Sequence, residues 1–259
     1  MNSFIRRHAL PIRTFLAKIV TVRPVVGMSL MEKVASIVAS EKIDGDYLEF
    51  GVFRGGAFIE SYHALRQAFE QRIGAAQHFN GTAADSAERR AIWNRLRFFA
   101  FDSFEGLPEL QGIDKRSRDF AQGQYAAGVD EFLDNVTANG VPADKVICVP
   151  GWFDQTCNAA TIEKYKLTKA AVIWIDCDLY HSTKSVLDFI PPLLQDGTVI
   201  IFDDWYSFRG NPRLGEQRAF AEWQQGLQGF TLSQYKGEGA WRNSFIVSEV
   251  FEATLPTTH

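Results

Sequence analysis

The stretch "AVIWIDCDLYHST" (residues 171–183) places an apolar run directly before two aspartates. Five successive apolar residues, from Ala171 to Ile175, are typical of a strand buried on both faces of a parallel sheet. Asp176 and Asp178 follow, with one residue between them. Burying a carboxylate costs several kcal/mol unless a positive charge or hydrogen-bond donors meet it. The end of this strand therefore has to supply a partner for two acids.

Strand-like and helix-like segments alternate on both sides of this stretch. Apolar runs predict strands over residues 45–52, 98–104, 145–153, 171–178, 197–205, 230–236 and 244–250. Helical patterns fall at residues 28–41, 55–72, 83–96, 129–139, 158–166, 182–195 and 214–227. This alternation favours an α/β fold with a mostly parallel seven-stranded sheet and helices on both faces. Because only "GEGAWRN" separates the last two strands, we expect them to form an antiparallel edge.

The composition is that of an average globular protein. The 259 residues are 46% hydrophobic and 22% charged, and the net charge of −4 gives no general attraction to nucleic acid. Three cysteines without a CxxC or Cys/His pattern suit a reducing cytoplasm, where we expect the protein to work. No apolar run reaches the roughly 18 residues that a membrane span needs, so we expect no stable membrane insertion.

The chain shows no linker, so we expect one domain over residues 28–259. A basic arm over residues 1–27 precedes it, and we interpret this arm as a lid or an oligomer contact; binding to a membrane surface is the alternative. The polar residues 73–97 look like an addition to the α/β frame. Residues 107–128 follow the second strand and are either a lid over a substrate or a plain surface loop.

Acidic residues mark the ends of the first two predicted strands. Glu49 is followed by Gly51 and Gly55, and glycines in such a turn let a ligand approach the backbone at a helix N-terminus. The spacing is not GxGxxG, so the dinucleotide fingerprint is missing. Asp102, at the end of the second strand, is placed either to take the hydroxyls of a ribose or to cap a loop or helix.

The fourth and fifth strands end in Asp176, Asp178, Asp203 and Asp204. Because neighbouring parallel strands end at the same edge, we expect these carboxylates to lie close together and to repel one another without a cation. Oxygen ligands without cysteine or histidine suit a hard divalent cation, Mg²⁺ first and Ca²⁺ or Mn²⁺ next. The alternative is that some of these acids cap the helices that follow.

With these residues in view, the chain resembles class I S-adenosylmethionine-dependent methyltransferases. More narrowly, it resembles the macrocin O-methyltransferase family, metal-dependent enzymes that methylate sugar hydroxyls of macrolide and aminocoumarin antibiotics. The matching segments are "DGDYLEFGVFRGGA", "FAFDSFEGLP", "GWFDQT", "IDCDLYHST", "GTVIIFDDW" and "RAFAEW", between residues 44 and 223. The resemblance implies a single-domain Rossmann-like fold, S-adenosylmethionine as cofactor and a hydroxyl on a sugar or natural product as acceptor.

The resemblance also implies a role for each residue. The turn at Glu49, Gly51 and Gly55 would hold the methionine part of the cofactor, Asp102 the ribose, and Ser103 would lie beside the adenine. The remaining residues implied to lie at the cofactor are Gly151, Trp152, Phe153 and Asp176.

For the metal, the resemblance implies Asp176, Asp203 and Asp204 as ligands. Asp178 would take the proton of the acceptor hydroxyl. His181 stands where relatives often carry an acid, which makes it an alternative base, a substrate contact or an ordinary surface residue.

Two other functions are compatible with the same acids: a metal-dependent hydrolase or phosphoryl-transfer enzyme, and a non-catalytic binding protein. The first has no P-loop and no histidine-rich two-metal pattern to support it. The second is disfavoured by the complete set of acids, although fold alone never proves function. As partners we expect a small-molecule acceptor, no nucleic acid, and a second copy of the chain in a homodimer or larger homo-oligomer.

Overall fold

Seven strands form one sheet in the order β3-β2-β1-β4-β5-β7-β6. The computed structural model describes residues 27–75 and 82–251. The basic arm predicted over residues 1–27 and the 76–81 part of the polar segment therefore fall almost entirely outside the described residues. The parallel strands are joined by helices, while β7 runs antiparallel to both β5 and β6. The prediction of a mostly parallel sheet with an antiparallel edge is confirmed.

The element bounds follow the predicted pattern closely. The strands are β1 (Asp46–Phe50), β2 (Phe98–Asp102), β3 (Val146–Pro150), β4 (Ala170–Ile175), β5 (Val199–Phe202), β6 (Phe230–Glu238) and β7 (Arg242–Glu249). The α-helices are α1 (Leu30–Glu41), α2 (Gly56–Ala75), α3 (Ala83–Arg95), α4 (Val129–Ala138), α5 (Phe153–Thr156), α6 (Ala159–Tyr165), α7 (Tyr180–Phe189) and α8 (Gly215–Gly226). Short 3₁₀ helices are η2 (Gly112–Arg116), η3 (Ala143–Lys145), η4 (Pro191–Leu193) and η5 (Phe208–Gly210).

The differences from the predicted bounds lie mainly at the carboxyl ends of the strands. The strand predicted over 171–178 ends at Ile175, so the alternation of side chains along a strand does not extend to Asp178. Instead, Asp178 adopts a left-handed backbone with φ of 59°, which turns the chain into α7. The helix predicted over 182–195 begins earlier, at Tyr180, and ends at Phe189, because the prolines that follow cannot continue its hydrogen bonding.

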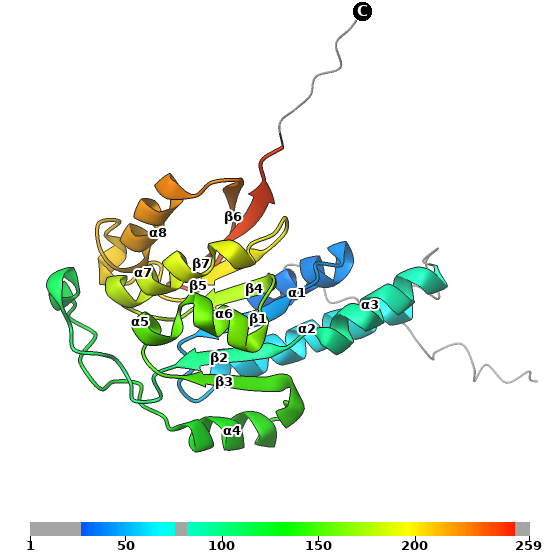
Figure 1. The fold of residues 1–259 in the computed structure, drawn as a ribbon, viewed down its shortest axis with the longest axis horizontal. Helices are drawn as coiled ribbons and strands as arrows, with labels where there is room; N and C mark the ends of the chain where they lie inside the picture. The colour runs from blue at the N-terminus through cyan, green and yellow to red at the C-terminus, as the bar shows by residue number, and fades with distance from the viewer. Residues whose placement is uncertain (1–26, 76–81, 252–259) are drawn as a thin grey trace, which may run out of the picture.

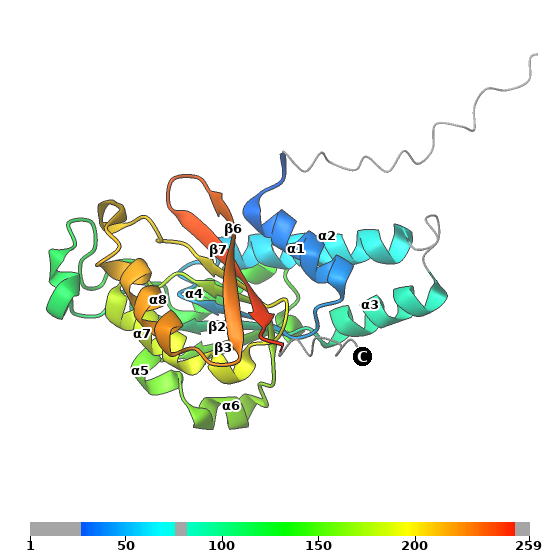
Figure 2. The ribbon, with the colours of Figure 1, turned by 90° about the horizontal axis from the view of Figure 1, so that it is seen from above.

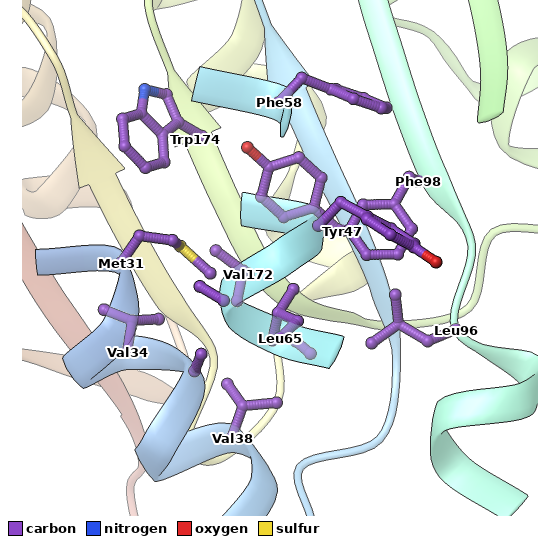
Figure 3. Packing of buried hydrophobic residues seen from close by; sticks show 14 of the residues in the cluster. Met31, Val34, Val38, Tyr47, Phe58, Leu65, Leu96, Phe98, Val172 and Trp174 are labelled. Atoms are coloured by element: carbon purple, nitrogen blue, oxygen red, sulfur yellow. The ribbon is translucent and has the colours of Figure 1, made fainter. Parts of the chain in front are cut away.

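Alternate side chains of the central strands pack into two apolar clusters, one on each face of the sheet. Tyr47 and Trp174 belong to the cluster covered by α1 to α4, while Phe50 and Ile175 belong to the cluster covered by α5 to α8. Figure 2 shows α1 and α2 on the opposite side of the sheet from α5 and α6. In Figure 3, Tyr47 lies beside Phe58 of α2 and Phe98 of β2. A sheet buried on both faces explains why its strands are nearly continuous apolar runs.

Residues 103–128, called the roof segment from here on, join β2 to α4 and contain η2. Figure 1 shows this segment as a green loop that extends beyond the carboxyl ends of the strands. Its base is closed by two backbone hydrogen bonds: Leu107 N donates to Gln124 O (2.8 Å) and Gly123 N donates to Leu107 O (2.9 Å). The sheet below and the roof segment above frame the space in which the predicted site residues lie.

Candidate active site

A cavity of about 720 Å³ opens at the carboxyl ends of β1, β2, β4 and β5. Most of the predicted site residues border it: Gly51, Asp102, Ser103, Trp152, Phe153, Asp176, Asp178, His181, Asp203 and Asp204. Among the predicted site residues, Glu49, Gly55 and Gly151 do not border it. Sequence positions up to 153 residues apart along the chain are thus brought to one hollow, as expected where parallel strands end together.

Three carboxylates gather at the ends of β4 and β5. Asp176, Asp178 and Asp204 each offer an oxygen, and these oxygens all lie within 4.8 Å of one another. Burial, with repulsion from Asp203 and Asp178, raises the pKa of Asp176 well above its usual range. Burial and the adjoining Asp204 likewise raise the pKa of Asp178. A buried set of oxygens under this much repulsion suits a hard divalent cation.

The fourth predicted acid, Asp203, is held differently. Arg242 of β7 donates from Nε to Asp203 Oδ1 (2.6 Å) and from Nη1 to Glu238 (3.1 Å), and its guanidinium lies 5.1 Å from the centre of the Trp174 ring. Burial still raises the pKa of Asp203, with Arg242 pulling in the opposite direction. The gathered trio of Asp176, Asp178 and Asp204 therefore contains Asp178, whereas the metal ligands predicted from the sequence included Asp203. Whether Asp178 or Asp203 is the third metal ligand has to be tested.

Asp204 is positioned by its neighbours on both sides. Its carboxylate accepts a hydrogen bond from Ser207 Oγ (2.7 Å), and its backbone N–H donates to the buried Glu216 Oε2 (3.1 Å). Within the described part of the chain, Glu216 Oε1 has no hydrogen-bond partner, and burial raises the pKa of Glu216 well above its usual range. Glu216 thus adds another acid behind the gathered trio.

Asp102 closes the turn after β1 from the neighbouring strand. Its Oδ2 accepts from the backbone N–H groups of Val52 (2.7 Å) and Phe53 (3.2 Å), and its Oδ1 accepts from Phe104 N–H (2.8 Å). Asp102 therefore caps a loop, one of the two interpretations from the sequence, and it also borders the cavity. Its contact with a ribose stays a prediction. Ser103 Oγ also lies 3.5 Å from Asp102 Oδ1, but it has a shorter hydrogen bond to Gly106 O (2.9 Å). Since a carboxylate has about four acceptor directions, the three backbone donors leave capacity toward a ligand.

Gly51 and Gly55 are required by packing within the chain. Gly51 has φ of 87°, and a Cβ there would lie 1.9 Å from the carbonyl oxygen of Asp176. Gly55 has φ of 83°, and a Cβ there would lie 2.5 Å from Val136 of α4. These glycines lack a side chain because Asp176 and α4 approach them closely. Their contact with a ligand stays a prediction.

Glu49 lies below the cavity, in the core. It is 1% exposed and accepts a hydrogen bond from the Tyr47 hydroxyl. Burial raises its pKa well above its usual range, while the Tyr47 hydroxyl acts in the opposite direction. A direct contact of Glu49 with the cofactor stays a prediction.

Aromatic side chains line the cavity on two sides. Trp152 is the N-cap residue of α5, Phe153 is its first residue, and both border the cavity. At the mouth, Phe53 and Tyr125 meet edge to face with ring centres 5.8 Å apart, and Tyr125 is half exposed. These walls can hold a flat ring system such as an adenine.

Three functional neighbours were not found in the sequence: Glu216, Arg242 and Asp114 of the roof segment. Asp114 is 1% exposed and pairs with His181, its Oδ2 lying 2.6 Å from His181 Nδ1. No local motif marks Asp114 and Arg242, because Asp114 pairs with α7 and Arg242 pairs with Asp203 over long stretches of chain. The unusual histidine in "DLYHST" was the available signal for Asp114.

A seven-stranded sheet in this order, with β7 antiparallel between β5 and β6 and acids at the ends of β1, β2, β4 and β5, defines the class as a Rossmann-like class I methyltransferase fold. The family model of the macrocin-O-methyltransferases (TylF) matches residues 72–222, and the chain belongs to this family. The resemblance noted in the sequence is confirmed.

Two curated relatives are named as O-methyltransferases. The chain is 31% identical over 173 residues to 8-demethyl-8-(2,3-dimethoxy-alpha-L-rhamnosyl)-tetracenomycin-C 4'-O-methyltransferase of Streptomyces olivaceus, covering 65% of this chain and 56% of the relative. It is 29% identical over 190 residues to mycinamicin III 3''-O-methyltransferase of Micromonospora griseorubida, covering 70% and 64%. The chain thus spans about three fifths of the length of these relatives.

Among solved structures, the O-methyltransferase NovP shares the fold with a TM-score of 0.62 at 21% identity, covering 85% of this chain and 78% of NovP. In the described residues, no helix combines the length and apolar character needed to cross a membrane.

Proposed function

We propose that the protein is an S-adenosylmethionine-dependent O-methyltransferase that uses a divalent cation, Mg²⁺ first, to methylate a hydroxyl of a small molecule. The acceptor class we propose is a sugar or a sugar-bearing natural product, in keeping with the rhamnosyl group in the name of the first relative. The observation that carries the proposal is the gathering of Asp176, Asp178 and Asp204 in the cavity that Asp102 also borders.

The donor set fits a hard cation. The three acids offer only oxygens, Asp178 is buried and the other two are partly buried, and burial with repulsion from neighbouring acids raises the pKa of Asp176 and Asp178. Asp176 and Asp204 belong both to the predicted ligand set and to the gathered trio, so we assign both to the metal. For the third ligand we keep Asp203: Arg242 occupies its Oδ1, and a carboxylate has a second oxygen to offer.

The other side of the cavity fits a nucleoside. Asp102 keeps acceptor capacity for ribose hydroxyls, Ser103 lies beside it, and Trp152 and Phe153 provide an apolar wall for the adenine. The sulfonium of the cofactor supplies a methyl group that is already a good electrophile, so the protein needs no covalent intermediate.

The chain's own work is to orient the hydroxyl and remove its proton. An alcohol holds its proton too tightly to attack at neutral pH, and a divalent cation lowers the pKa of an oxygen that it contacts. We assign Asp178 as the base that accepts this proton on a carboxylate oxygen, because it lies beside the metal residues without being needed to complete their set. The aromatic walls and the roof segment exclude water from the path of in-line transfer.

Calorimetry with the purified chain tests the proposal. We expect S-adenosylmethionine to bind both with and without a chelator, and methyl transfer to stop when the chelator is added. Mg²⁺ should bind wild type and Asp119→Asn with the same affinity, because Asp119 is an exposed acid outside the cavity lining. Binding of Mg²⁺ to Asp204→Asn should be lost. No binding at millimolar S-adenosylmethionine would overturn the assignment.

A further inference from the structure

The roof segment supplies much of the wall above the acids. Leu107, Pro108, Glu109, Gln111 and Tyr125 all border the cavity. Between its closed base and its tip, the segment contacts the loop after β5 through the rings of Phe120 and Phe208, whose centres lie 5.7 Å apart. The shape of the cavity therefore depends on where the tip of this segment is held.

The tip is held by Asp114 of η2. Its Oδ1 accepts from Tyr180 N–H (2.9 Å), and its Oδ2 accepts from His181 N–H (3.2 Å) and lies 2.6 Å from His181 Nδ1. The first backbone N–H groups of any helix lack partners inside the helix. In α7 the N-cap residue Leu179 supplies no side-chain acceptor, so Asp114, 66 residues earlier in the chain, takes that role.

Asp114 also fixes the ring of His181. Its Oδ2 accepts a hydrogen bond from the ring at Nδ1, which fixes the direction in which that edge of the ring points. Gly112 lies close to another edge: its φ is 49°, and a Cβ there would lie 3.1 Å from Cε1 of His181. The ring thus lies between Asp114 and Gly112 of the roof segment.

We propose that Asp114 is a positioning residue that fastens the roof segment to the N-terminus of α7, and so holds the cavity wall and the His181 ring in place. This goes beyond the proposed function, because the fastening acts on any ligand of the cavity. Asp114 contacts no reacting group in this role; it acts through α7 and His181.

Limited digestion with trypsin tests the fastening directly, because Lys115, Arg116 and Arg118 follow Asp114 in the roof segment. Cleavage at such sites follows the population of the locally opened state. We expect Asp114→Ala to speed cleavage at these three residues by about tenfold, read by mass spectrometry. Asp119→Ala is the matched control, since this exposed acid of the same segment accepts no side-chain hydrogen bond in the described structure, and it should be cut as slowly as wild type.

Two further variants keep the test decisive. Asp114→Asn keeps an acceptor for the helix and loses the charge, and His181→Ala keeps the helix contacts and loses the ring; both should show a smaller increase than Asp114→Ala. If Asp114→Ala fails to fold by circular dichroism, these two variants carry the comparison. Equal cleavage of all variants and wild type would overturn the proposal.

Binding of S-adenosylhomocysteine, measured by calorimetry, provides the second readout. We expect a dissociation constant about fivefold higher for Asp114→Ala than for wild type, and no change for Asp119→Ala. Failure of wild type to bind this probe would count against the methyltransferase assignment, while the digestion result would still decide the role of Asp114. Unchanged affinity together with unchanged digestion would refute the fastening.

Discussion

The two ends of the central sheet differ in whether their buried acids have a cationic partner. At the amino end of β1, the side chain of Asp46 is 8% exposed and is met by Arg97, which donates from Nε (2.9 Å) and Nη2 (2.5 Å) to its two oxygens. Arg97 also donates to the carbonyl oxygen of Tyr165 (2.8 Å). At the carboxyl end, Asp176, Asp178 and Asp204 crowd together, and the nearby Arg242 is bonded to Asp203 instead.

This difference separates a structural charge from a functional one. A bidentate pair with its hydrogen bonds satisfied holds its geometry without further partners. Acids that outnumber their cations raise one another's pKa values and stay ready to bind a cation or take a proton. The same fold therefore places its neutralised charge at one end and its unneutralised charge at the end where the cavity opens.

The largest effect is expected at Asp178. Asp178→Asn should lower turnover about 10³-fold, because a positioned general base contributes about 10²–10⁴-fold to proton transfer. Its affinity for Mg²⁺ should stay within about twofold of wild type, because the remaining acids supply the ligands. Asp203→Asn is the matched comparison and should lower the Mg²⁺ affinity. If Asp178→Asn loses the metal and Asp203→Asn keeps it, then Asp178 is the third ligand and the base lies elsewhere, with His181 the next candidate.

At the amino end of β1, Arg97→Gln breaks the ion pair between Arg97 and Asp46. We expect a loss of about 2 kcal/mol in the free energy of unfolding, because the Asp46 carboxylate then lacks a charged partner in a mostly buried place. Urea denaturation measures it. Arg95→Gln is the control: its pair with Asp44 is more exposed and Asp44 keeps Lys169, so the loss should stay below about 1 kcal/mol. Equal losses of unfolding free energy in the two variants would show that burial does not determine how much each ion pair stabilises the protein.

The sequence predicted the order and type of the elements better than it predicted where the strands end. The order and type of the elements followed from alternating apolar runs and helical patterns, and the acids at the strand ends were recognised from their spacing. The strand predicted to carry Asp176 and Asp178 ends before them, because the left-handed Asp178 starts the turn into α7. A periodic pattern reports burial along an element and does not show where a turn replaces its last residues.

Partners across long distances were out of reach of any local pattern. Arg242 meets Asp203 from 39 residues away, and Asp114 meets α7 from 66 residues away. A Cβ at Gly51 would meet the backbone of Asp176, and the sequence gives no sign of this close approach. Such contacts form only when helices and strands pack against one another in the folded protein. A single sequence therefore shows which residues are charged but not which of them pair.

A smaller effect of the opposite sign is expected when an acid is removed from the crowded end. In a chelator, Asp178→Asn should raise the free energy of unfolding by about 1 kcal/mol, because it removes one charge from a set of repelling carboxylates. Asparagine also tolerates the left-handed backbone at this position. Asp119→Asn should leave stability unchanged. A loss of stability in Asp178→Asn would show that the acids at this end are structural, as Asp46 is.

The smallest effect is the pH dependence of that gain. Burial and mutual repulsion raise the pKa of Asp176, Asp178 and Asp203 in the folded state. Below the unfolded pKa of about 4 these groups are protonated in both states, so wild type and Asp178→Asn should be about equally stable. As pH rises from about 4 toward the raised folded values, the folded state still holds protons that the unfolded state has lost, so wild-type stability falls relative to the variant and levels off once the folded groups have also ionised. Denaturation at pH 5, 6, 7 and 8 in a chelator should therefore show a widening gap between the two proteins, and saturating Mg²⁺ should narrow it by stabilising the charged acids. A gap that stays constant with pH would mean that the crowded acids are already neutralised by the chain itself.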